Sequence, residues 1–465
     1  MDLAVIGGGP GGYVAAIRAG QLGMKVALIE KENVGGICLN WGCIPSKALL
    51  RSAEIIRIIE RAAEFGVSVD GIRTDMGQAV RRSRQVVDRM VKGVEFLLEK
   101  NGVQVLQGEG YLRSATEIEV RGSGDSVVAR NTIIATGARS RSLPGIEIDG
   151  ETVITSREAL LLAEPPSSIV IVGGGPVGVE FAYYYRAFGS AVTIVEMLPR
   201  LVPNEDEDVS RLLERAFKQQ GIGIMTGTRV EGMEQRDGGW HIRVVTPQGT
   251  DTVPAERVLL GVGVQPNSDG MGLEELGVAM ERGFIQIDEH MATNVPGIYA
   301  IGDVTGKLAL AHVASAQGVT AVEAIAGLEP PSLSYDDMPR ATYCQPQVAS
   351  IGLTEAQARA RGYEVKVARF PLRGNGKALA LGEAEGFAKI VADARYGDIL
   401  GCHLIGPEVT ELISEVSLAR VLEATPNEVG LTVHPHPTLS EAVKEAALAI
   451  KGEAVHFWFG DARGG

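Results

Sequence analysis

The chain carries one nucleotide-binding pattern twice, and this duplication strongly limits the folds it can adopt. Each copy consists of a short apolar strand, a glycine-rich turn of the form G-x-G-x-x-G, a helix, a second apolar strand and an acidic residue. The turn directs the N–H groups at the start of the helix toward a pyrophosphate, and the acid can bind a ribose 2′-hydroxyl. Each copy therefore predicts a Rossmann-like unit built on a parallel sheet.

The two copies have the same internal spacing. In the first, we expect strands over residues 3–6 and 26–29, a helix ending near residue 22, and the signature residues Gly7, Gly9, Gly12 and Glu30. In the second, we expect strands over residues 169–172 and 192–195, a helix ending near residue 188, and the signature residues Gly173, Gly175, Gly178 and Glu196. Both acids lie about eighteen residues after the third glycine, close to the spacing that the pattern requires. We predict that the protein binds two dinucleotides.

Later segments extend the repeat. Residues 131–138, with Thr136 and Gly137, and residues 258–263, with Gly263, are each predicted to form a buried strand and a glycine turn beneath a nucleotide. Residues 293–303 end in Gly302 and Asp303, which would place a carboxylate at the ligand-binding edge of the sheet; a plain turn is the alternative. We also expect one long helical region over residues 51–100 and a strand over residues 284–287.

Two cysteines follow the first copy directly. Cys38 and Cys43 stand five positions apart after the glycine pair Gly35-Gly36. This spacing alone is weak, because cysteines are often small buried apolar residues. If residues 44–59 form a helix, however, its N-terminal dipole favours the thiolate of Cys43, the form that reacts in thiol–disulfide exchange. We treat the pair as a candidate redox disulfide.

Composition narrows the class of protein. A chain of 465 residues predicts about two to four domains. A formal charge of −14 argues against non-specific nucleic-acid binding. We expect no membrane span, no secretory leader and no metal site. The low cysteine count, 4 in all, points to a reducing cytosol and a catalytic pair, and we interpret Cys344 and Cys402 as buried apolar residues.

The last part of the chain has a different pattern. After Pro330-Pro331, strands over residues 365–370, 388–392 and 399–405 and two late helices predict a separate α+β domain.

A histidine-rich segment, His434-Pro435-His436-Pro437-Thr438-Leu439-Ser440-Glu441, lies within this last part. Because the prolines keep it extended, at most one of the two histidines can face a given site. Glu441 has two possible roles: it can orient a histidine that acts as a base, or complete a capping box with Thr438 before a helix over residues 439–450. Both roles can coexist only if its two oxygens serve different partners.

Taken together, these motifs resemble the FAD-dependent pyridine nucleotide–disulfide oxidoreductases over essentially the full length. The most specific segments are Gly36-Ile37-Cys38-Leu39-Asn40, Gly42-Cys43-Ile44-Pro45-Ser46-Lys47, and residues 434–441. The resemblance implies an α/β fold with two Rossmann-like domains, for FAD and NAD, and a C-terminal α+β dimerisation domain. The implied boundaries are 1–148 for the FAD domain, 149–272 for the NAD domain, 273–341 for a central segment completing the FAD domain, and 342–465 for the dimerisation domain.

The resemblance also implies an activity: oxidation of protein-bound dihydrolipoamide to lipoamide with NAD⁺. Cys38 would exchange with substrate and Cys43 would face the flavin. Lys47 would approach the flavin and pair with Glu180 where the nicotinamide enters, although from the residues alone they are a surface charge and a first-turn acid. His436, oriented by Glu441, would be the base and would come from the other subunit of an obligate homodimer. FAD contacts are expected from Gly7, Gly9, Gly12, Glu30, Gly36, Lys47, Thr136, Gly137, Gly302, Asp303 and Ala311, and NAD contacts from Gly173, Gly175, Gly178, Glu180, Glu196 and Gly263.

The expected partner is a lipoyl-bearing acyltransferase or carrier protein of a 2-oxo-acid dehydrogenase or glycine-cleavage complex, in the cytoplasm. The chain departs from the family pattern at Ile37, at Trp41 and at Val264, which stands where an arginine is usual.

Two other functions remain open. Glutathione-type reductases use NADPH, whose 2′-phosphate Glu196 would repel, and they tend to carry a tyrosine where this chain has Pro176. Mercuric and large thioredoxin reductases need extra C-terminal cysteines, which Phe459–Gly465 lacks. A redox-inactive flavoprotein serving as a structural subunit is the alternative outside the enzymes.

Overall fold

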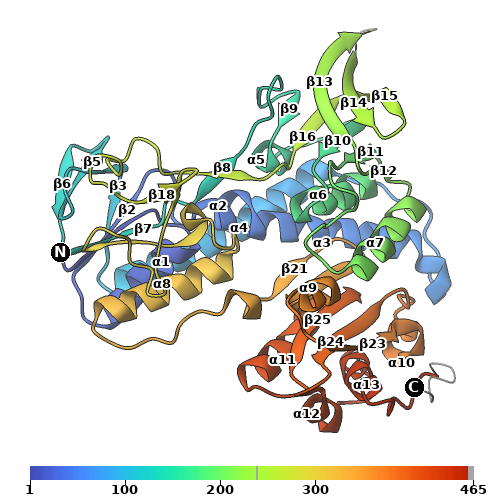
Figure 1. Ribbon diagram of the computed structural model, residues 1–465. Coiled ribbons are helices and arrows are strands. Elements are labelled where there is room, and N and C mark those ends of the chain that lie inside the picture. The colour runs from blue at the N-terminus through green and yellow to red at the C-terminus, as the bar shows by residue number, and fades with distance from the viewer. Residues whose placement is uncertain (237–238, 459–465) are drawn as a thin grey trace.

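The computed structural model describes residues 1–236 and 239–458, so the tail segment Phe459–Gly465 lies outside the described part of the chain. Figure 1 shows three units: an N-terminal sheet with its helices, a second sheet from which a three-stranded hairpin layer projects, and a C-terminal unit packed below the second. This is the α/β architecture with two Rossmann-like units and a C-terminal α+β unit that the sequence predicts.

The first unit is built on a five-stranded parallel sheet in the order β20-β7-β1-β2-β3. Every residue of β1 and β2 is buried, as expected for parallel strands covered on both faces. Helices α1 and α8 pack together on this unit. The bounds are β1 Leu3–Ile6, β2 Val26–Glu30, β3 Gln104–Gln107, β7 Asn131–Ile134, β20 Ile298–Ala300, α1 Pro10–Gln21 and α8 Ala311–Ile325, with an antiparallel layer β4 Glu109–Leu112, β5 Glu117–Arg121 and β6 Asp125–Val128.

The second unit repeats this plan. Its parallel sheet has the order β12-β11-β10-β16-β9, so that β10 and β11 take the places of β1 and β2. The difference lies in the outer strand, which precedes β10 in the second unit but follows the whole second unit in the first. The bounds are β9 Val153–Ile154, β10 Ser168–Val172, β11 Ala191–Val195, β12 Gly223–Met225, β16 Arg257–Leu260, α5 Ser156–Ala159, α6 Pro176–Ala187 and α7 Glu207–Gln219, with the layer β13 Arg229–Arg236, β14 Gly239–Thr246 and β15 Gly249–Ala255.

The helical region after the cysteines is not continuous, contrary to the prediction for residues 51–100. Helix α2 (Gly36–Trp41) leads into α3 (Cys43–Glu60), a 3₁₀ turn follows over Ala62–Phe65, and α4 (Met76–Lys100) begins only after a loop. Gly66 in that loop has a φ of +76°, a conformation that ends a helix and that glycine adopts without strain. Asp75 then caps α4 by accepting a hydrogen bond from the N–H of Gln78.

The C-terminal unit has a five-stranded antiparallel sheet in the order β21-β22-β25-β24-β23. All three predicted strands form, but the late helices number three rather than two within the described residues. The bounds are β21 Arg340–Thr342, β22 Gln347–Gly352, β23 Val365–Pro371, β24 Phe387–Asp393, β25 Ile399–Gly406, α9 Glu355–Ala360, α10 Gly376–Ala380, α11 Val409–Val421, α12 Pro426–Leu431 and α13 Glu441–Ala449.

Short two-stranded pairings complete the fold. β8 (Ala138–Ser140) pairs with β17 (Val264–Pro266) and joins the two nucleotide-type units. β18 (Met280–Glu281) pairs with β19, which covers only Phe284–Ile285 and is shorter than the strand predicted there. Among the described residues, none of the helices combines the length and the apolar character needed to cross a bilayer.

Candidate active site

The two glycine turns have nearly the same geometry. Gly7 and Gly173 have φ values of +106° and +110°. A Cβ on Gly12 would lie 1.8 Å from the carbonyl oxygen of Gly7, and a Cβ on Gly178 would lie 1.9 Å from that of Gly173, so only glycine fits these positions. By contrast, a Cβ at the middle glycine, Gly9, would meet nothing within 4 Å, and the same holds for Gly175. The middle glycine of each turn therefore faces open space into which a pyrophosphate can approach the backbone.

The acid after each second strand is held in the same way. Glu30 is buried and accepts hydrogen bonds from the N–H groups of Gly8 (2.6 Å) and Glu32 (2.7 Å). Glu196 is likewise buried and accepts hydrogen bonds from Gly174 (2.6 Å) and Leu198 (2.7 Å). These contacts fix each carboxylate beside its glycine turn, where it can accept a hydrogen bond from a ribose hydroxyl.

A cavity of about 690 Å³ opens at the first turn. Most of the predicted FAD residues line it, together with both cysteines: Gly7, Gly9, Glu30, Gly36, Cys38, Cys43, Thr136, Gly137, Gly302, Asp303 and Ala311. Two predicted FAD residues do not. Gly12 is buried behind the turn, and Lys47 points to the second unit instead.

Asp303 shows that this cavity suits a hydroxyl-bearing ligand. It belongs to the 3₁₀ turn Gly302–Thr305 that follows β20, and burial raises the pKa of its carboxyl. Its neighbour Gly302 is anchored, because the N–H of Gly302 donates to Oε1 of Gln317 at 2.6 Å. In the described part of the chain, however, the carboxylate of Asp303 accepts no hydrogen bond. Asp303 is half-buried at the cavity wall, where its carboxylate can accept a hydrogen bond from a donor on the ligand, such as a ribityl hydroxyl of FAD.

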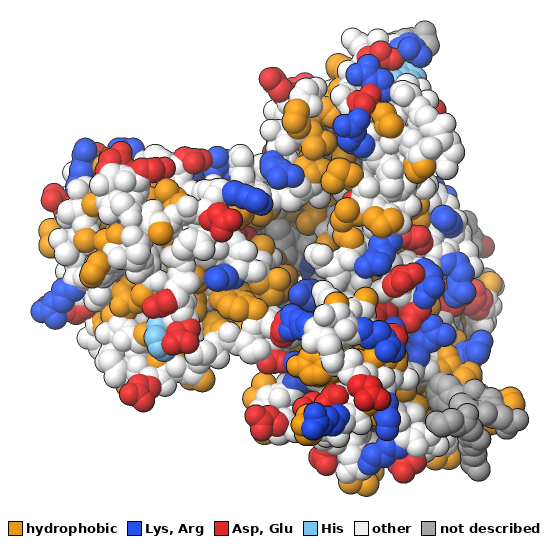
Figure 2. Space-filling model, viewed as in Figure 1, with side chains coloured by type: hydrophobic (Ala, Val, Ile, Leu, Met, Phe, Trp, Pro, Cys, Tyr) orange, Lys and Arg blue, Asp and Glu red, His pale blue; other side chains and the backbone are white. Residues whose placement is uncertain are grey.

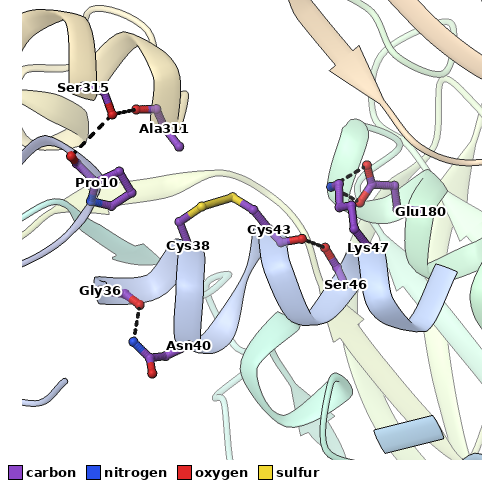
Figure 3. The surroundings of a disulfide bond; sticks show 10 residues. All are labelled: Pro10, Gly36, Cys38, Asn40, Cys43, Ser46, Lys47, Glu180, Ala311 and Ser315. Atoms are coloured by element: carbon purple, nitrogen blue, oxygen red, sulfur yellow. Dashed lines mark hydrogen bonds and ion pairs between the residues drawn. A yellow bond between two sulfur atoms is a disulfide. The ribbon is translucent and has the colours of Figure 1, made fainter. Parts of the chain in front are cut away.

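Cys38 and Cys43 form a disulfide at the border of this cavity, joining the middle of α2 to the start of α3 (Figure 3). Gly36, at the start of α2, lies so close to the first turn that an added Cβ would come within 2.7 Å of the Cα of Gly9. Cys43 is the first residue of the 18-residue helix α3, as the sequence predicts to within one position. The positive end of the helix dipole therefore lies at Cys43 and stabilises a thiolate there.

Lys47 and Glu180 face each other across the boundary between the first two units (Figure 3). The Nζ of Lys47 lies 2.9 and 3.1 Å from the two carboxylate oxygens of Glu180. Oε1 of Glu180 also accepts the N–H of Tyr343, and the lysine ammonium lies 4.4 Å from the centre of the Tyr343 ring. This pair therefore ties α3, α6 and the C-terminal unit together beside the disulfide, and Tyr343 is a member that sequence reasoning missed.

Glu441 makes both of the contacts that the sequence leaves open, one with a histidine and one with the backbone before the helix. Its Oε1 accepts a hydrogen bond from Nδ1 of His436 at 2.9 Å, and its Oε2 accepts the N–H of Thr438 at 2.9 Å. Partial burial opposes its ionisation, but these two hydrogen bonds outweigh that effect and lower its pKa. The capping box is only half formed, because the Thr438 hydroxyl donates to the carbonyl of Pro435 and α13 begins at Glu441 itself.

The two histidines of this segment differ in what their rings can do. His434 is buried and uses both nitrogens, with Nδ1 on the carbonyl of Thr432 and Nε2 on Glu415 at 2.7 Å. The side chain of His436 is 77% exposed, and within residues 1–236 and 239–458 only its Nδ1 has a hydrogen-bond partner. As the spacing predicts, the rings face different surroundings, and of the two rings only that of His436 has a nitrogen without a partner among the described residues.

The His436–Glu441 pair lies far from the cavity of its own chain. Neither residue lines that cavity, and Figure 1 shows α13 at the far end of the C-terminal unit from α2. The His436–Glu441 pair therefore lies away from the disulfide of its own chain.

Two further clusters could not be anticipated from local sequence patterns. Lys389 on β24 is 4% exposed and contacts three carboxylates, those of Asp206 and Asp208 (both 2.8 Å) and Glu355 (3.1 Å). Although burial disfavours its charge, Asp206 and Asp208 raise its pKa. Asp206 and Asp208 lie 183 and 181 positions away from Lys389 in the sequence, so no local pattern reveals the network.

The second cluster surrounds Trp41, between the two cysteines. Two guanidiniums lie over its ring, that of Arg84 at 4.6 Å and that of Arg157 at 4.3 Å from the ring centre. Arg157 also pairs with Glu32. Trp41 lines the cavity, so these contacts join the disulfide segment to α4 and α5 at the cavity wall.

The two remaining cysteines, Cys344 and Cys402, are fully buried free thiols, as predicted. Burial raises the pKa of both thiols, to about 12 for Cys402.

Comparisons with known proteins identify the family of the chain. Residues 1–318 match the family described as pyridine nucleotide-disulphide oxidoreductase, and residues 338–447 match its dimerisation domain, so the protein is a homodimer. The chain is 47% identical to dihydrolipoyl dehydrogenase of Bacillus subtilis and 50% identical to that of Mycobacterium leprae, each over 98% of this chain and 99% of the relative.

Solved structures give the same result. LpdA from Mycobacterium tuberculosis superposes with a TM-score of 0.90 at 29% identity, covering 97% of this chain and 100% of that one. The HOCl-induced flavoprotein disulfide reductase RclA from Escherichia coli superposes with a TM-score of 0.84 at 27% identity, covering 96% and 99%. The chain therefore belongs to the pyridine nucleotide-disulphide oxidoreductase family, with FAD and NAD as its cofactors.

Proposed function

We propose that this protein is a dihydrolipoyl dehydrogenase, which oxidises protein-bound dihydrolipoamide to lipoamide with NAD⁺ as acceptor. The observation that carries the proposal is the Cys38–Cys43 disulfide at the border of the cavity beside the first glycine turn. The relatives that match this chain over nearly its full length are named for the same activity.

The thiol chemistry follows from the positions of the two cysteines. Nε2 of His436 removes a proton from one thiol of dihydrolipoamide, and the resulting thiolate attacks Sγ of Cys38. The S–S bond breaks and Cys43 leaves as a thiolate. The second substrate thiol then displaces Cys38 from the mixed disulfide and its proton passes to the departing Cys38 sulfur, so that the substrate leaves as a cyclic disulfide and the enzyme holds two reduced sulfurs. Bound FAD supplies the two-electron carrier between these sulfurs and NAD⁺.

The surroundings of Cys43 favour its role as the leaving sulfur. The N-terminus of α3 stabilises the negative charge that forms on it, and the Lys47 ammonium lies one helical turn further along the same face. Glu180 holds that ammonium in place. We propose that this ion pair holds Lys47 at the boundary between the first two units, where the nicotinamide would enter, rather than free in solvent.

We propose that His436 and Glu441 serve the disulfide of the partner subunit. Their own chain places them away from its cavity, and an exposed apolar surface on α11, α12 and the following loop can bury itself against a second copy. This surface consists of Leu418, Val421, Leu422, Leu431 and Val433, each at least 60% exposed.

Glu196 supports NAD over NADP. Its carboxylate accepts two backbone hydrogen bonds, as that of Glu30 does, and a 2′-phosphate at this position would be repelled by the negative charge.

We assign NAD contacts to Gly173, Gly175, Gly178, Glu180, Glu196 and Gly263, within residues 149–272. In this assignment residues 1–148 and 273–341 bind FAD, and residues 342–465 form the dimerisation domain.

We further propose a lipoyl-bearing acyltransferase or carrier protein of a 2-oxo-acid dehydrogenase or glycine-cleavage complex as the partner, in the cytoplasm.

Steady-state rates of the FAD-loaded enzyme with NADH or NADPH, each paired with lipoamide or glutathione disulfide, test this function. We expect turnover with NADH and lipoamide, and very little with the other three combinations. The variant Cys38→Ser should lose lipoamide turnover but keep electron transfer from NADH to a dye. Faster turnover with NADPH and glutathione disulfide would identify a glutathione-type reductase instead. Absence of a long-wavelength charge-transfer band after two-electron reduction would favour the redox-inactive subunit.

A further inference from the structure

A second concave surface, of about 920 Å³, lies between α7 of the second unit and strands β23 and β24 of the C-terminal unit. Four arginines line it, Arg211, Arg215, Arg369 and Arg373, with two carboxylates, Asp208 and Glu385. We call this surface the arginine groove. Figure 2 shows that Lys and Arg side chains interleave with Asp and Glu over α7 and the adjoining strands. The groove shares no lining residue with the cavity at the first glycine turn.

Three of the four guanidiniums have hydrogen-bond donors without an acceptor. In the described part of the chain, neither Arg215, Arg369 nor Arg373 donates a hydrogen bond. Arg215 lies 3.6 Å from Glu385 and Arg369 lies 3.6 Å from Asp208, which are loose ion pairs. Each guanidinium offers five N–H groups, so the wall of the groove has an excess of donors.

One of the two carboxylates of the groove is shared with a cation outside it. Asp208 pairs with Arg211 and with the buried ammonium of Lys389, the latter at 2.8 Å. Its pKa is held low because the interactions with Lys389 and Arg211 outweigh the cost of its burial, so it stays charged and bound to them. Four arginines and two carboxylates therefore leave the groove positive, although the whole chain carries a formal charge of −14.

Two of these arginines are also held in place by aromatic rings. The Arg369 guanidinium lies 5.3 Å from the ring centre of Phe387, which is buried, and that of Arg373 lies 5.2 Å from the ring centre of Phe457. Such contacts limit the rotamers of a long side chain and reduce the entropy lost when it binds a ligand.

We propose that the arginine groove binds a small polyvalent oxyanion that carries two or more phosphate groups. The planar guanidinium fork matches the oxygens of a phosphate group. The arginines come from three elements, α7, β23 and the 3₁₀ turn Leu372–Gly374, so a ligand must carry several charges to engage them together. This proposal stands independently of the proposed function, because the groove contains neither the disulfide nor a glycine turn.

Isothermal titration of the FAD-loaded protein with inorganic tripolyphosphate tests the proposal. Saturating NAD⁺ is included so that the second glycine turn is occupied. We expect one tripolyphosphate site per chain, which weakens as the salt concentration rises and which sulfate fills much more weakly.

The double variant Arg369→Gln/Arg373→Gln should bind tripolyphosphate at least about tenfold more weakly, because each lost guanidinium removes charge-assisted hydrogen bonds. The matched control is Arg395→Gln/Arg282→Gln, which removes the same charge from two exposed arginines outside the groove and should bind as the unmodified protein does. Equal binding by the groove variant and the unmodified protein overturns the proposal, and so does the absence of a tripolyphosphate site. If the double variant melts at a lower temperature, Arg373→Gln alone, which breaks no ion pair, gives the same comparison.

Discussion

Glu441 is shared between His436 and the backbone of the segment that precedes α13. One carboxylate oxygen accepts a hydrogen bond from Nδ1 of His436 at 2.9 Å, and the other accepts a hydrogen bond from the N–H of Thr438 at 2.9 Å. The same side chain therefore sets both the path of the segment and the orientation of the imidazole. Since Nδ1 donates to Glu441, Nε2 is left as the acceptor that faces outward.

Replacing Glu441 by Gln should lower the rate of dihydrolipoamide oxidation roughly ten- to hundredfold. The amide keeps an oxygen for one of the two donors but loses the charge that stabilises a protonated imidazole. NADH-to-dye transfer, which needs no base, should not change, and stopped-flow reduction by dihydrolipoamide measures the difference. The matched control is Glu415→Gln, since Glu415 binds a histidine with no free nitrogen. Equal losses in both variants would mean that the effect is merely structural.

Replacing Asp303 by Asn should stabilise the FAD-free protein at neutral pH. Burial raises the pKa of this carboxyl, so the folded state holds its proton at higher pH than the unfolded state does. An acid with a raised folded pKa costs stability as pH rises above the unfolded value of about 3.9.

The stabilisation by Asp303→Asn should therefore disappear when the pH falls to that value, and thermal melting of the FAD-free proteins at several pH values measures it. The variant should also release FAD more readily, because an amide accepts a ribityl hydroxyl more weakly than a carboxylate does. A lower melting temperature at neutral pH would contradict the prediction.

Replacing Lys389 by Met should lower the free energy of unfolding by about 3–5 kcal/mol, because it leaves the buried carboxylate of Asp206 without its cation. Denaturant titration followed by tryptophan fluorescence gives the value. The control Lys366→Met, on the neighbouring strand β23, removes an exposed lysine and should change stability by less than about 0.5 kcal/mol. Because Lys389 joins the second unit to the C-terminal unit, the variant should also lose cooperativity between them. An unfolding free energy equal to that of Lys366→Met would show that the network contributes no stability.

Replacing Trp41 by Val should cost about 1–3 kcal/mol, since two guanidinium–ring contacts are lost. In a double-mutant cycle with Arg157→Leu, the two losses should add to more than the loss in the double variant, because both changes remove the same contact. Thermal melts of the four proteins supply the comparison, and simple additivity would argue against the stack.

Local signals allowed most of the nucleotide-binding framework to be predicted. Strand, turn, helix and acid are contiguous in each copy, so Gly7 to Glu30 and Gly173 to Glu196 could be placed before the structure was known. The break between α3 and α4 was missed because Gly66 and Gly71 are also tolerated, at a cost, within helices. The half-formed capping box could not be foreseen. The Thr438 hydroxyl donates a hydrogen bond to the carbonyl of Pro435 instead of accepting one from a backbone N–H at the start of the helix.

The rest of the site depends on contacts between distant parts of the chain. Tyr343 reaches Glu180 across 163 positions, and Lys389 reaches Asp206 across 183. Neither residue stands in a pattern that marks it, because a single lysine in a strand is usually exposed. Only the packing of the second and C-terminal units brings these partners together.

The outer strand β20 has a consequence for the order in which the protein can be completed. It comes from Ile298–Ala300, yet it pairs with β7 of the N-terminal sheet, whereas the second sheet draws all five strands from residues 153–260. A growing chain therefore delivers every strand of the second sheet before the last strand of the first. During synthesis the edge of β7 stays open until residues 298–300 leave the ribosome, and the part of the protein that begins first is finished later.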